Sequence, residues 1–318
     1  MSFLIQQTLI YAVPLMIVAL AGVFAERSGI INLALEGIMI FGAFIGVLFV
    51  RQMQGLEVFN AAKAAGDWGT LQGLVLLAML MSAAMGALFS LLLSFASINL
   101  RADQTIGGTA LNLLATALAM VIAKGVNHSA SAKLDYSNRV FVYDFGPLTV
   151  NVFLFIGLVA LILSYIVLYK TRLGLRLRAC GEHPQAADSV GINVYKMRYI
   201  GVLISGVLGG IGGMAYIIPS VSSWNFEVGV SGAGFLALAV MIFGQWKPFR
   251  IFLAAGFFAL SKSLANIASS IPFLADLGWT QNMYNMIPFI ASMIILAFTS
   301  KKSRAPKAEG IPYDKGMR

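Results

Sequence analysis

The sequence has little charge, a single cysteine and two histidines. Of its 318 residues, 11% are charged and 59% are hydrophobic, whereas an ordinary soluble domain carries about 25% charged residues. Cys180 has no second cysteine with which to form a disulfide, and His128 and His183 fall in loops that we expect on opposite faces of the protein. These scarcities exclude a water-soluble globular fold, a disulfide framework and a shared metal site.

Three sequence patterns are also missing. There is no G-x-x-x-x-G-K-[ST] phosphate loop, so the chain itself does not bind ATP in the usual way, and we expect no cofactor in it. Histidine, cysteine, serine and acidic residues do not gather on one predicted face, which argues against a membrane enzyme and leaves no catalytic candidate. Met1–Phe24 contains no Lys or Arg and no typical cleavage site, so we interpret it as a retained first helix.

Long apolar runs make up most of the chain, and a helical crossing of a bilayer needs about 20 apolar residues. The run at 232–246 is short for a crossing and suits a broken or re-entrant helix. We therefore predict an all-α membrane protein, a polytopic helical bundle of about nine transmembrane segments (eight to ten) within residues 1–300. The runs are Phe3–Phe24, Ile30–Val50, Leu71–Leu100, Gln104–Ala123, Val150–Tyr169, Met197–Ile218, Gly232–Trp246, Phe249–Ile271 and Tyr284–Thr299.

Basic side chains are distributed unevenly among the predicted loops. With the amino terminus outside, most of the 22 Lys and Arg residues lie on the cytoplasmic side, which is the usual positive-inside bias. The net charge of +9 thus follows from topology and gives no support for nucleic-acid binding. We expect a multi-pass protein of the cell (cytoplasmic) membrane, with its amino terminus outside and a basic cytoplasmic tail at residues 301–318.

Part of the sequence recurs about 200 residues later. Ser28-Gly29, Leu33-Ala34-Leu35 and Met39-Ile40-Phe41-Gly42 correspond to Ser231-Gly232, Leu236-Ala237-Leu238 and Met241-Ile242-Phe243-Gly244. The predicted topology runs the two copies in opposite directions, which is typical of the inverted repeats of transport proteins. Chance similarity between apolar helices is the alternative.

Two ionisable residues, Glu36 and Lys262, fall well inside predicted segments, where facing lipid would cost about 2.5 to 3.5 kcal/mol each. Both should therefore point into the protein, either as pathway residues or as a helix anchor and a snorkelling side chain. A polar stripe provides further pathway candidates, although its side chains equally suit hydrogen bonds between helices. Its members are Gln104, Thr105, Thr109, Asn112 and Thr116, and the spacing of 105, 109, 112 and 116 predicts one shared helical face.

The loop at residues 171–197, the longest that we place in the cytoplasm, contains a short helix signal. Pro184 suits the first helical position and Gly191 suits a left-handed cap. A helix of residues 184–190 is marginal alone and needs support from its flanks or from another protein. Small side chains at Ala186 and Ala187 would allow it to enter a groove of a partner.

This loop resembles the coupling loop of permeases in ABC importers of the branched-chain amino acid, ribose and nucleoside class. Within that class, the chain is most similar to the nucleoside permeases, and the matching stretches span most of the chain. They are Glu26–Gly37, Ala102–Asn112, Gly229–Ala239 and Gly244–Pro248.

The resemblance implies a pathway-forming subunit that performs no covalent chemistry. Its expected partners are an ABC ATPase that binds ATP and Mg²⁺, a second permease in a heterodimer, and an extracytoplasmic binding protein or lipoprotein. By the same resemblance, Gly181, Glu182, Pro184, Ala186, Ala187 and Gly191 dock on the ATPase. The expected solutes are nucleosides or related purines. Alternatives are simple sugars or branched-chain amino acids, or an ion-coupled secondary transporter that uses Glu36 and Lys262 directly.

Overall fold

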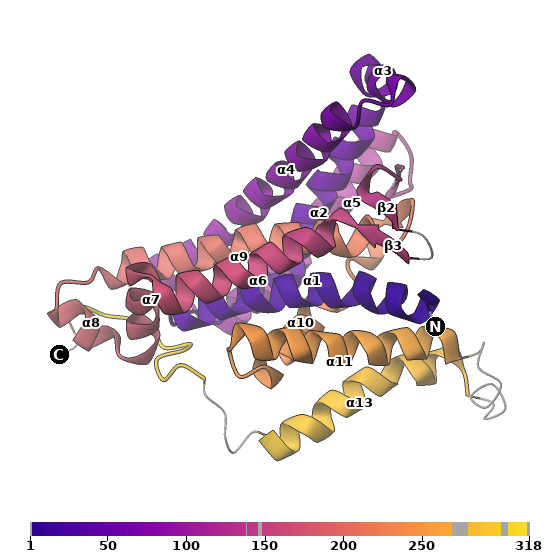
Figure 1. Cartoon of the computed structure of the whole chain (residues 1–318). Coiled ribbons are helices and arrows are strands. Elements are labelled where there is room, and N and C mark those ends of the chain that lie inside the picture. Colours follow the sequence, from indigo (N-terminus) through magenta and orange to yellow (C-terminus); the bar gives the residue numbers. More distant parts are fainter. Residues whose placement is uncertain (1, 138, 146–147, 269–278, 300–304, 317–318) are drawn as a thin grey trace.

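A computed structural model describes residues 2–137, 139–145, 148–268, 279–299 and 305–316, and Figure 1 shows their arrangement. The described part is a helical bundle with two small antiparallel sheets, β1 with β4 and β2 with β3. The long helices are α1 (Ser2–Arg27), α2 (Leu35–Gln54), α4 (Trp68–Ser94), α5 (Gln104–Asn127), α6 (Val152–Lys170), α9 (Val194–Ile217), α11 (Pro248–Ile267) and α13 (Gln281–Thr299). The shorter elements are α3 (Glu57–Ala65), η1 (Phe95–Asn99), β1 (Lys133–Asp135), η2 (Arg139–Phe141), β2 (Val142–Phe145), β3 (Leu148–Asn151), α7 (Arg172–Glu182), α8 (Pro184–Ser189), β4 (Ser223–Asn225), η3 (Phe226–Val228) and α10 (Ala233–Phe243).

Helices α1 and α9 form the centre of the bundle. α1 packs against α9, α11, α10 and α6, while α9 also packs against α4 and α2. Glycines allow the closest approaches: a Cβ at Gly213 would lie 2.1 Å from the carbonyl oxygen of Met39, and one at Gly210 would lie 2.3 Å from that of Ser82. Any larger residue at these positions would push the helices apart, as expected for small-residue contacts between membrane helices.

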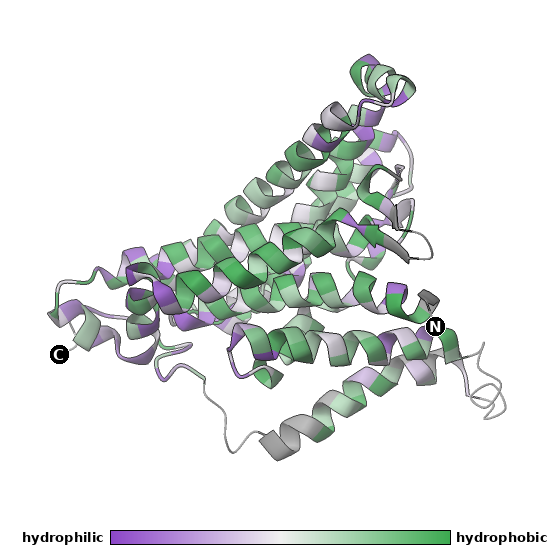
Figure 2. Cartoon of the chain, viewed as in Figure 1, coloured by the Kyte–Doolittle hydropathy of each residue, from purple (hydrophilic) through white to green (hydrophobic). Residues whose placement is uncertain are grey.

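Hydrophobic residues cover the length of the bundle, and hydrophilic residues gather toward its two ends (Figure 2). Large apolar side chains are exposed on the outer faces of α4, α5 and α6, including Leu80, Leu113 and Ile162. In water such faces would aggregate, whereas in a bilayer they contact lipid at no cost. The surface therefore agrees with the predicted membrane location.

The expected count of nine crossings is not confirmed. Among the described residues, seven helices are long and apolar enough to cross a membrane: α1, α2, α4 with η1, α5, α6, α9 and α11. The segment expected at 232–246 is α10, an apolar helix of only 11 residues. Helix α13 coincides with the last expected segment, 284–299, but is not one of the seven. Residues 269–271, the end of the expected run Phe249–Ile271, lie outside the described residues.

The amino terminus lies at the opposite end of the bundle from α7, α8 and the described C-terminal residues (Figure 1). This separation agrees with termini on opposite sides of the membrane. Which side is cytoplasmic stays a prediction, as does the inverted repeat. Of the expected basic tail, Lys301, Lys302 and Arg304 lie outside the described residues, whereas residues 305–316 fold back onto the bundle.

Candidate functional site

Residues 28–34 interrupt the helices between α1 and α2, and side chains of α5 hold this non-helical stretch. Gln104 accepts a hydrogen bond from the backbone N–H of Ile31 at 2.7 Å. Deeper along α5, Asn112 accepts from the N–H of Gly37 at 2.7 Å and donates to the carbonyl of Leu33 at 2.9 Å. Buried backbone groups must be paired, so these two amides make the interruption possible.

The members of the expected polar stripe on α5 differ in exposure. Gln104 and Asn112 are buried against the 28–34 stretch, whereas Thr105 and Thr109 lie at the border of this buried face and are exposed. Thr109 donates to carbonyl groups of its own helix. Thr105, Thr109 and Asn112 thus follow one side of the helix, as their spacing predicts, but only Asn112 is buried. The buried face follows the small residues of α5 such as Gly108, which contacts Leu33 closely.

Glu36, in the first turn of α2, lies inside the protein and joins α2 to the start of α10. Its carboxylate accepts hydrogen bonds from the backbone N–H groups of Gly232, at 2.8 Å, and Gly234, at 2.6 Å. These are the unpaired N–H groups of a helix amino terminus, where a negative charge is favourable. Gly232 has a φ of +77°, a conformation that glycine adopts without strain.

A cavity of about 300 Å³ lies beside this junction. Its walls come from α1, α9, α10, α11, α13 and the residues just before α10, so it is built by segments distant in sequence. A volume of 300 Å³ is at the lower end of the range for small-molecule sites. The lining residues are Tyr11, Tyr216, Ser231, Gly232, Ala233, Leu236, Lys262, Asn266, Pro288 and Phe289.

Lys262 is held in this cavity by two tyrosines. Its Nζ donates a hydrogen bond to the Tyr216 hydroxyl at 3.0 Å and lies 4.9 Å and 5.2 Å from the ring centroids of Tyr11 and Tyr216. Aromatic faces attract cations at such distances. Asn266 Nδ2 donates to the Tyr11 hydroxyl at 3.0 Å. No ion pair joins Glu36 and Lys262, which are both described residues, so the two ionisable groups found in the sequence make separate contacts here.

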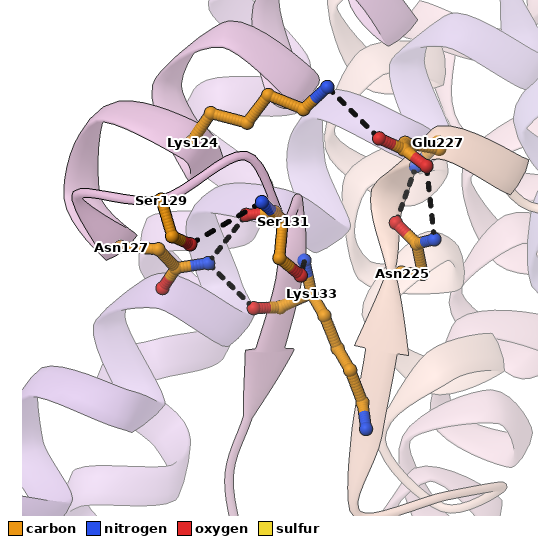
Figure 3. A network of polar contacts seen from close by, with 7 residues as sticks. All are labelled: Lys124, Asn127, Ser129, Ser131, Lys133, Asn225 and Glu227. Atoms are coloured by element: carbon orange, nitrogen blue, oxygen red, sulfur yellow. Dashed lines mark hydrogen bonds and ion pairs between the residues drawn. The ribbon is translucent and has the colours of Figure 1, made fainter.

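The two short strands β1 and β4, with the turn η3 that follows β4, lie beside the end of α5 (Figure 3). We call β1, β4 and η3 the β clasp. β1 pairs antiparallel with β4. Lys124 Nζ lies 3.0 Å from Glu227 Oε1, which holds the end of α5 against η3. Asn127 Nδ2 donates to the carbonyl of Lys133 at 2.8 Å. Hydrogen bonds from Lys124 and Asn225, and then the charge of Lys124, lower the pKa of Glu227.

The β clasp is connected directly to the cavity wall. Trp224 of β4 packs edge-on against Tyr216, with ring centroids 6.2 Å apart. The chain then passes through three residues with positive φ, Gly229 at +58°, Ser231 at +56° and Gly232 at +77°, before α10 begins. A displacement of the clasp would therefore be transmitted to Tyr216 and to the cavity.

The expected coupling segment has exposed surface at the end of the bundle that lies opposite the amino terminus. α8 covers Pro184–Ser189, with Pro184 in its first turn, and Gly191 follows with a φ of +82°, as the sequence predicts. Glu182, Ala186 and Gly191 are exposed, while Pro184 and Ala187 are buried. The expectation that both alanines face a partner therefore holds for the exposure of Ala186 only. Residues 172–182 form a further helix, α7, that the sequence analysis did not predict.

Gly181 connects this segment to the end of α1. A Cβ at Gly181 would lie 2.4 Å from the carbonyl oxygen of Arg27, so α7 and α1 touch without room for a side chain. Arg27 and Glu182 also form an ion pair at the surface, with Nη1 of Arg27 3.4 Å from Oε1 of Glu182. A movement of α7 and α8 thus acts on the point where α1 ends and the 28–34 stretch begins.

Residues 305–316, here called the C-terminal strap, lie across the same end of the bundle. The backbone N–H of Ala308 donates to the carbonyl of Gly181 at 2.8 Å, and that of Gly310 donates to Gly29 at 3.3 Å. Asp314 forms an ion pair with Arg101 at 2.7 Å. The strap therefore links α7 with the start of the non-helical stretch.

One acidic residue of the strap, Glu309, is partly buried. Burial raises the pKa of Glu309 to about 7, although a hydrogen bond with Glu26 and the charge of Arg27 act in the opposite direction. Glu26 in turn accepts a hydrogen bond from the indole of Trp246. The protonation of Glu309 is thus sensitive to pH near neutrality.

Glu36 and Lys262 are recognisable as candidates in the sequence, whereas the residues around them were not predicted. Tyr11, Tyr216 and Asn266 carry polar groups within apolar helices, which was the signal available in the sequence. Lys124 and Glu227 were not predicted because nothing in the sequence shows that the end of α5 and η3 meet.

Comparison with known proteins shows where this chain belongs. Residues 4–297 match the family described as branched-chain amino acid transport system / permease component. The chain is 41% identical to the guanosine ABC transporter permease protein NupQ of Bacillus subtilis, with 100% of this chain and 98% of NupQ covered. It is 40% identical to the nucleoside ABC transporter permease protein NupC of Lactococcus lactis, with 99% and 98% covered.

A second permease of Lactococcus lactis, the nucleoside ABC transporter permease protein NupB, is 27% identical over 53% of this chain and 46% of NupB. No solved structure matches this chain.

Proposed function

We propose that this chain, which belongs to the branched-chain amino acid transport system / permease component family, is the permease subunit of an ABC importer for nucleosides. Full-length relatives at 40% and 41% identity carry nucleoside and guanosine permease names. The cavity beside α10 carries the proposal on the structural side, because its lining combines aromatic rings with hydroxyl, amide and ammonium groups. These are the groups that stack on a base and hydrogen-bond to a neutral polar solute.

The occupied amino terminus of α10 supports a neutral solute. In many transporters a helix amino terminus binds the anionic group of the substrate. Here the carboxylate of Glu36 already accepts the hydrogen bonds of Gly232 and Gly234. A substrate carboxylate, such as that of an amino acid, would have to displace Glu36, whereas a nucleoside carries no such group.

The proposed complex contains partners that supply energy and substrate. An ABC ATPase binds ATP and Mg²⁺ and contacts the exposed face of α8, including Gln185, Ala186 and Val190. A second permease completes the pathway, in line with the resemblance to NupB as well as NupC. An extracytoplasmic binding protein or lipoprotein delivers the nucleoside at the end of the bundle that carries the β clasp and the amino terminus. In this proposal α8 and the strap, at the opposite end, lie in the cytoplasm.

A continuous series of contacts connects the proposed ATPase surface to the cavity. α8 follows α7, and α7 touches the end of α1 at Gly181 and Arg27. The 28–34 stretch leads from there to Glu36, which is bonded to the start of α10. ATP-driven movement of α8 would therefore change the position of Gly232 in the cavity wall, with binding of the solute biasing one of two states.

The test is nucleoside uptake by proteoliposomes that contain the whole importer, with the variant Ala186→Trp. Ala186 is exposed on α8, so a tryptophan there should block ATPase docking without disturbing the bundle, whereas Ala187 is 3% exposed and a tryptophan there would damage packing. We expect ATP-dependent guanosine uptake and ATPase co-purification to fall at least about tenfold in Ala186→Trp. Uptake by the permease chains without the ATPase would contradict the proposal and favour an ion-coupled transporter.

A further inference from the structure

The one charged group among the lining residues of the cavity, Lys262, is a hydrogen-bond donor only. Lys262 is an ammonium with three N–H groups and no acceptor, and only one of them is directed to Tyr216. Tyr216 accepts from Lys262 and Tyr11 accepts from Asn266, and a hydroxyl that accepts in this way also carries a proton that it can donate. The cavity therefore suits a ligand whose edge is rich in acceptors.

Nucleobases differ in this respect. Guanine presents O6 and N7 as neighbouring acceptors, and a lysine or arginine that contacts both is the commonest specific contact to this base. Adenine and cytosine present an exocyclic amino group, which is a donor, at the corresponding edge. An ammonium group directed at that amino group would face it donor to donor, and buried donors without an acceptor are costly.

The position of Lys262 also fixes where its remaining N–H groups point. The side chain is partly buried in the cavity lining, and its Nζ lies 4.9 Å and 5.2 Å from the centroids of the two tyrosine rings. Packing between the two rings reduces the conformational freedom of the lysine side chain and so favours one geometry of contact with a ligand. The tyrosine rings supply surfaces on which an aromatic base can stack.

We infer that Lys262, positioned by Tyr11 and Tyr216, selects nucleosides whose base carries a carbonyl oxygen, such as guanosine, over those with an amino group there, such as adenosine. The inference rests on the proposed function and assigns to the permease a discrimination that is separate from that of any binding protein. Lys262 contacts the transported solute and takes no part in covalent chemistry.

A purely structural role for Lys262 makes a different prediction. The ammonium attracts the carboxylate of Glu36 electrostatically even without a direct contact. If its only role were to balance that charge, its loss would reduce the uptake of all nucleosides equally. Under that role the ratio of guanosine uptake to adenosine uptake would stay at its wild-type value.

The experiment compares guanosine and adenosine uptake by the whole importer with Lys262→Met, Lys262→Arg and the double variant Lys262→Met/Glu36→Gln. The measured quantity is the ratio of kcat/KM for guanosine to that for adenosine. The same binding protein is used throughout, so its own selectivity cancels between variants. The double variant has no unbalanced buried charge and serves if Lys262→Met fails to assemble. Because Glu36→Gln is expected to slow both nucleosides alike, only the ratio is compared in this variant.

We expect the ratio to fall about tenfold in Lys262→Met and in the double variant, and to recover with Lys262→Arg, since a bidentate contact to a base contributes discrimination of roughly this size. An unchanged ratio, with both nucleosides slowed equally, would overturn the inference and leave the proposed function intact. Failure of the wild-type importer to transport any nucleoside would overturn both.

Discussion

Replacing Glu36 with glutamine tests the junction on which the cavity depends. The carboxylate of Glu36 accepts two backbone hydrogen bonds, at 2.8 Å from Gly232 and at 2.6 Å from Gly234. Glutamine has the same shape but only one carbonyl oxygen, and its NH₂ group is itself a donor. One of the two N–H groups at the start of α10 would therefore face another donor.

The expected loss follows from the number of contacts. A hydrogen bond to a charged group contributes about 1.5 to 3 kcal/mol, and a buried donor left unpaired costs about 1 to 3 kcal/mol. The favourable interaction of a negative charge with a helix amino terminus adds roughly 0.3 to 1 kcal/mol. Because one hydrogen bond remains in the variant, we expect a net destabilisation of the α2–α10 junction of about 2 to 4 kcal/mol.

The assay is nucleoside uptake by the reconstituted importer, together with the temperature at which the purified complex unfolds in detergent. We expect Glu36→Gln to lower uptake at least about tenfold and to lower the unfolding temperature. Glu57→Gln is the matched control, because Glu57 is an exposed residue in the first turn of α3 and the same chemical change there should have little effect. Wild-type uptake and stability in Glu36→Gln would refute the role of this carboxylate.

Two further predictions concern the ends of the bundle. Lys124→Glu should destabilise the β clasp and lower nucleoside uptake, because it places two acidic side chains together. The exchange Lys124→Glu/Glu227→Lys should restore most of the uptake. Equal defects in the single variant and the exchange would argue against the ion pair. Because the pKa of Glu309 is raised to about 7, the C-terminal strap should bind most tightly below the ordinary pKa of a glutamate and loosen as the pH rises through 7. Hydrogen-exchange protection of Ala308 and Gly310 should therefore fall between pH 6 and pH 8, with a smaller fall in Glu309→Gln; an equal fall in both would contradict this assignment.

The sequence was a good guide to the lipid-facing parts of the protein. Continuous apolar runs predict membrane helices because each crossing must bury its own backbone hydrogen bonds and expose apolar side chains to lipid. The short helix that begins at Pro184 and the left-handed backbone conformation of Gly191 were also predicted correctly. Here the reason is that helix ends depend on local backbone preferences. Helices α3 and α7 were missed because polar amphipathic helices outside the membrane lack this strong apolar signal.

The polar stripe of α5 shows why faces are harder to predict than helices. Spacing alone places Thr105, Thr109 and Asn112 close together around the helix, but the choice of buried face depends on which neighbour packs there. In the structure that neighbour is the 28–34 stretch, whose backbone groups require Gln104 and Asn112. The two threonines satisfy their hydroxyls within the helix or remain exposed, as is common for such residues in membrane helices.

The sequence alone determined that this chain is a helical membrane protein, which ionisable residues must avoid lipid, and where a short helix interrupts the polar loop. Each of these follows from the transfer free energy or backbone preference of a few neighbouring residues. Only the tertiary structure decided that Lys262 meets Tyr11 and Tyr216, and that Glu36 holds the start of α10. Those meetings depend on the rotation and packing of helices far apart in the chain, and no local energy specifies them.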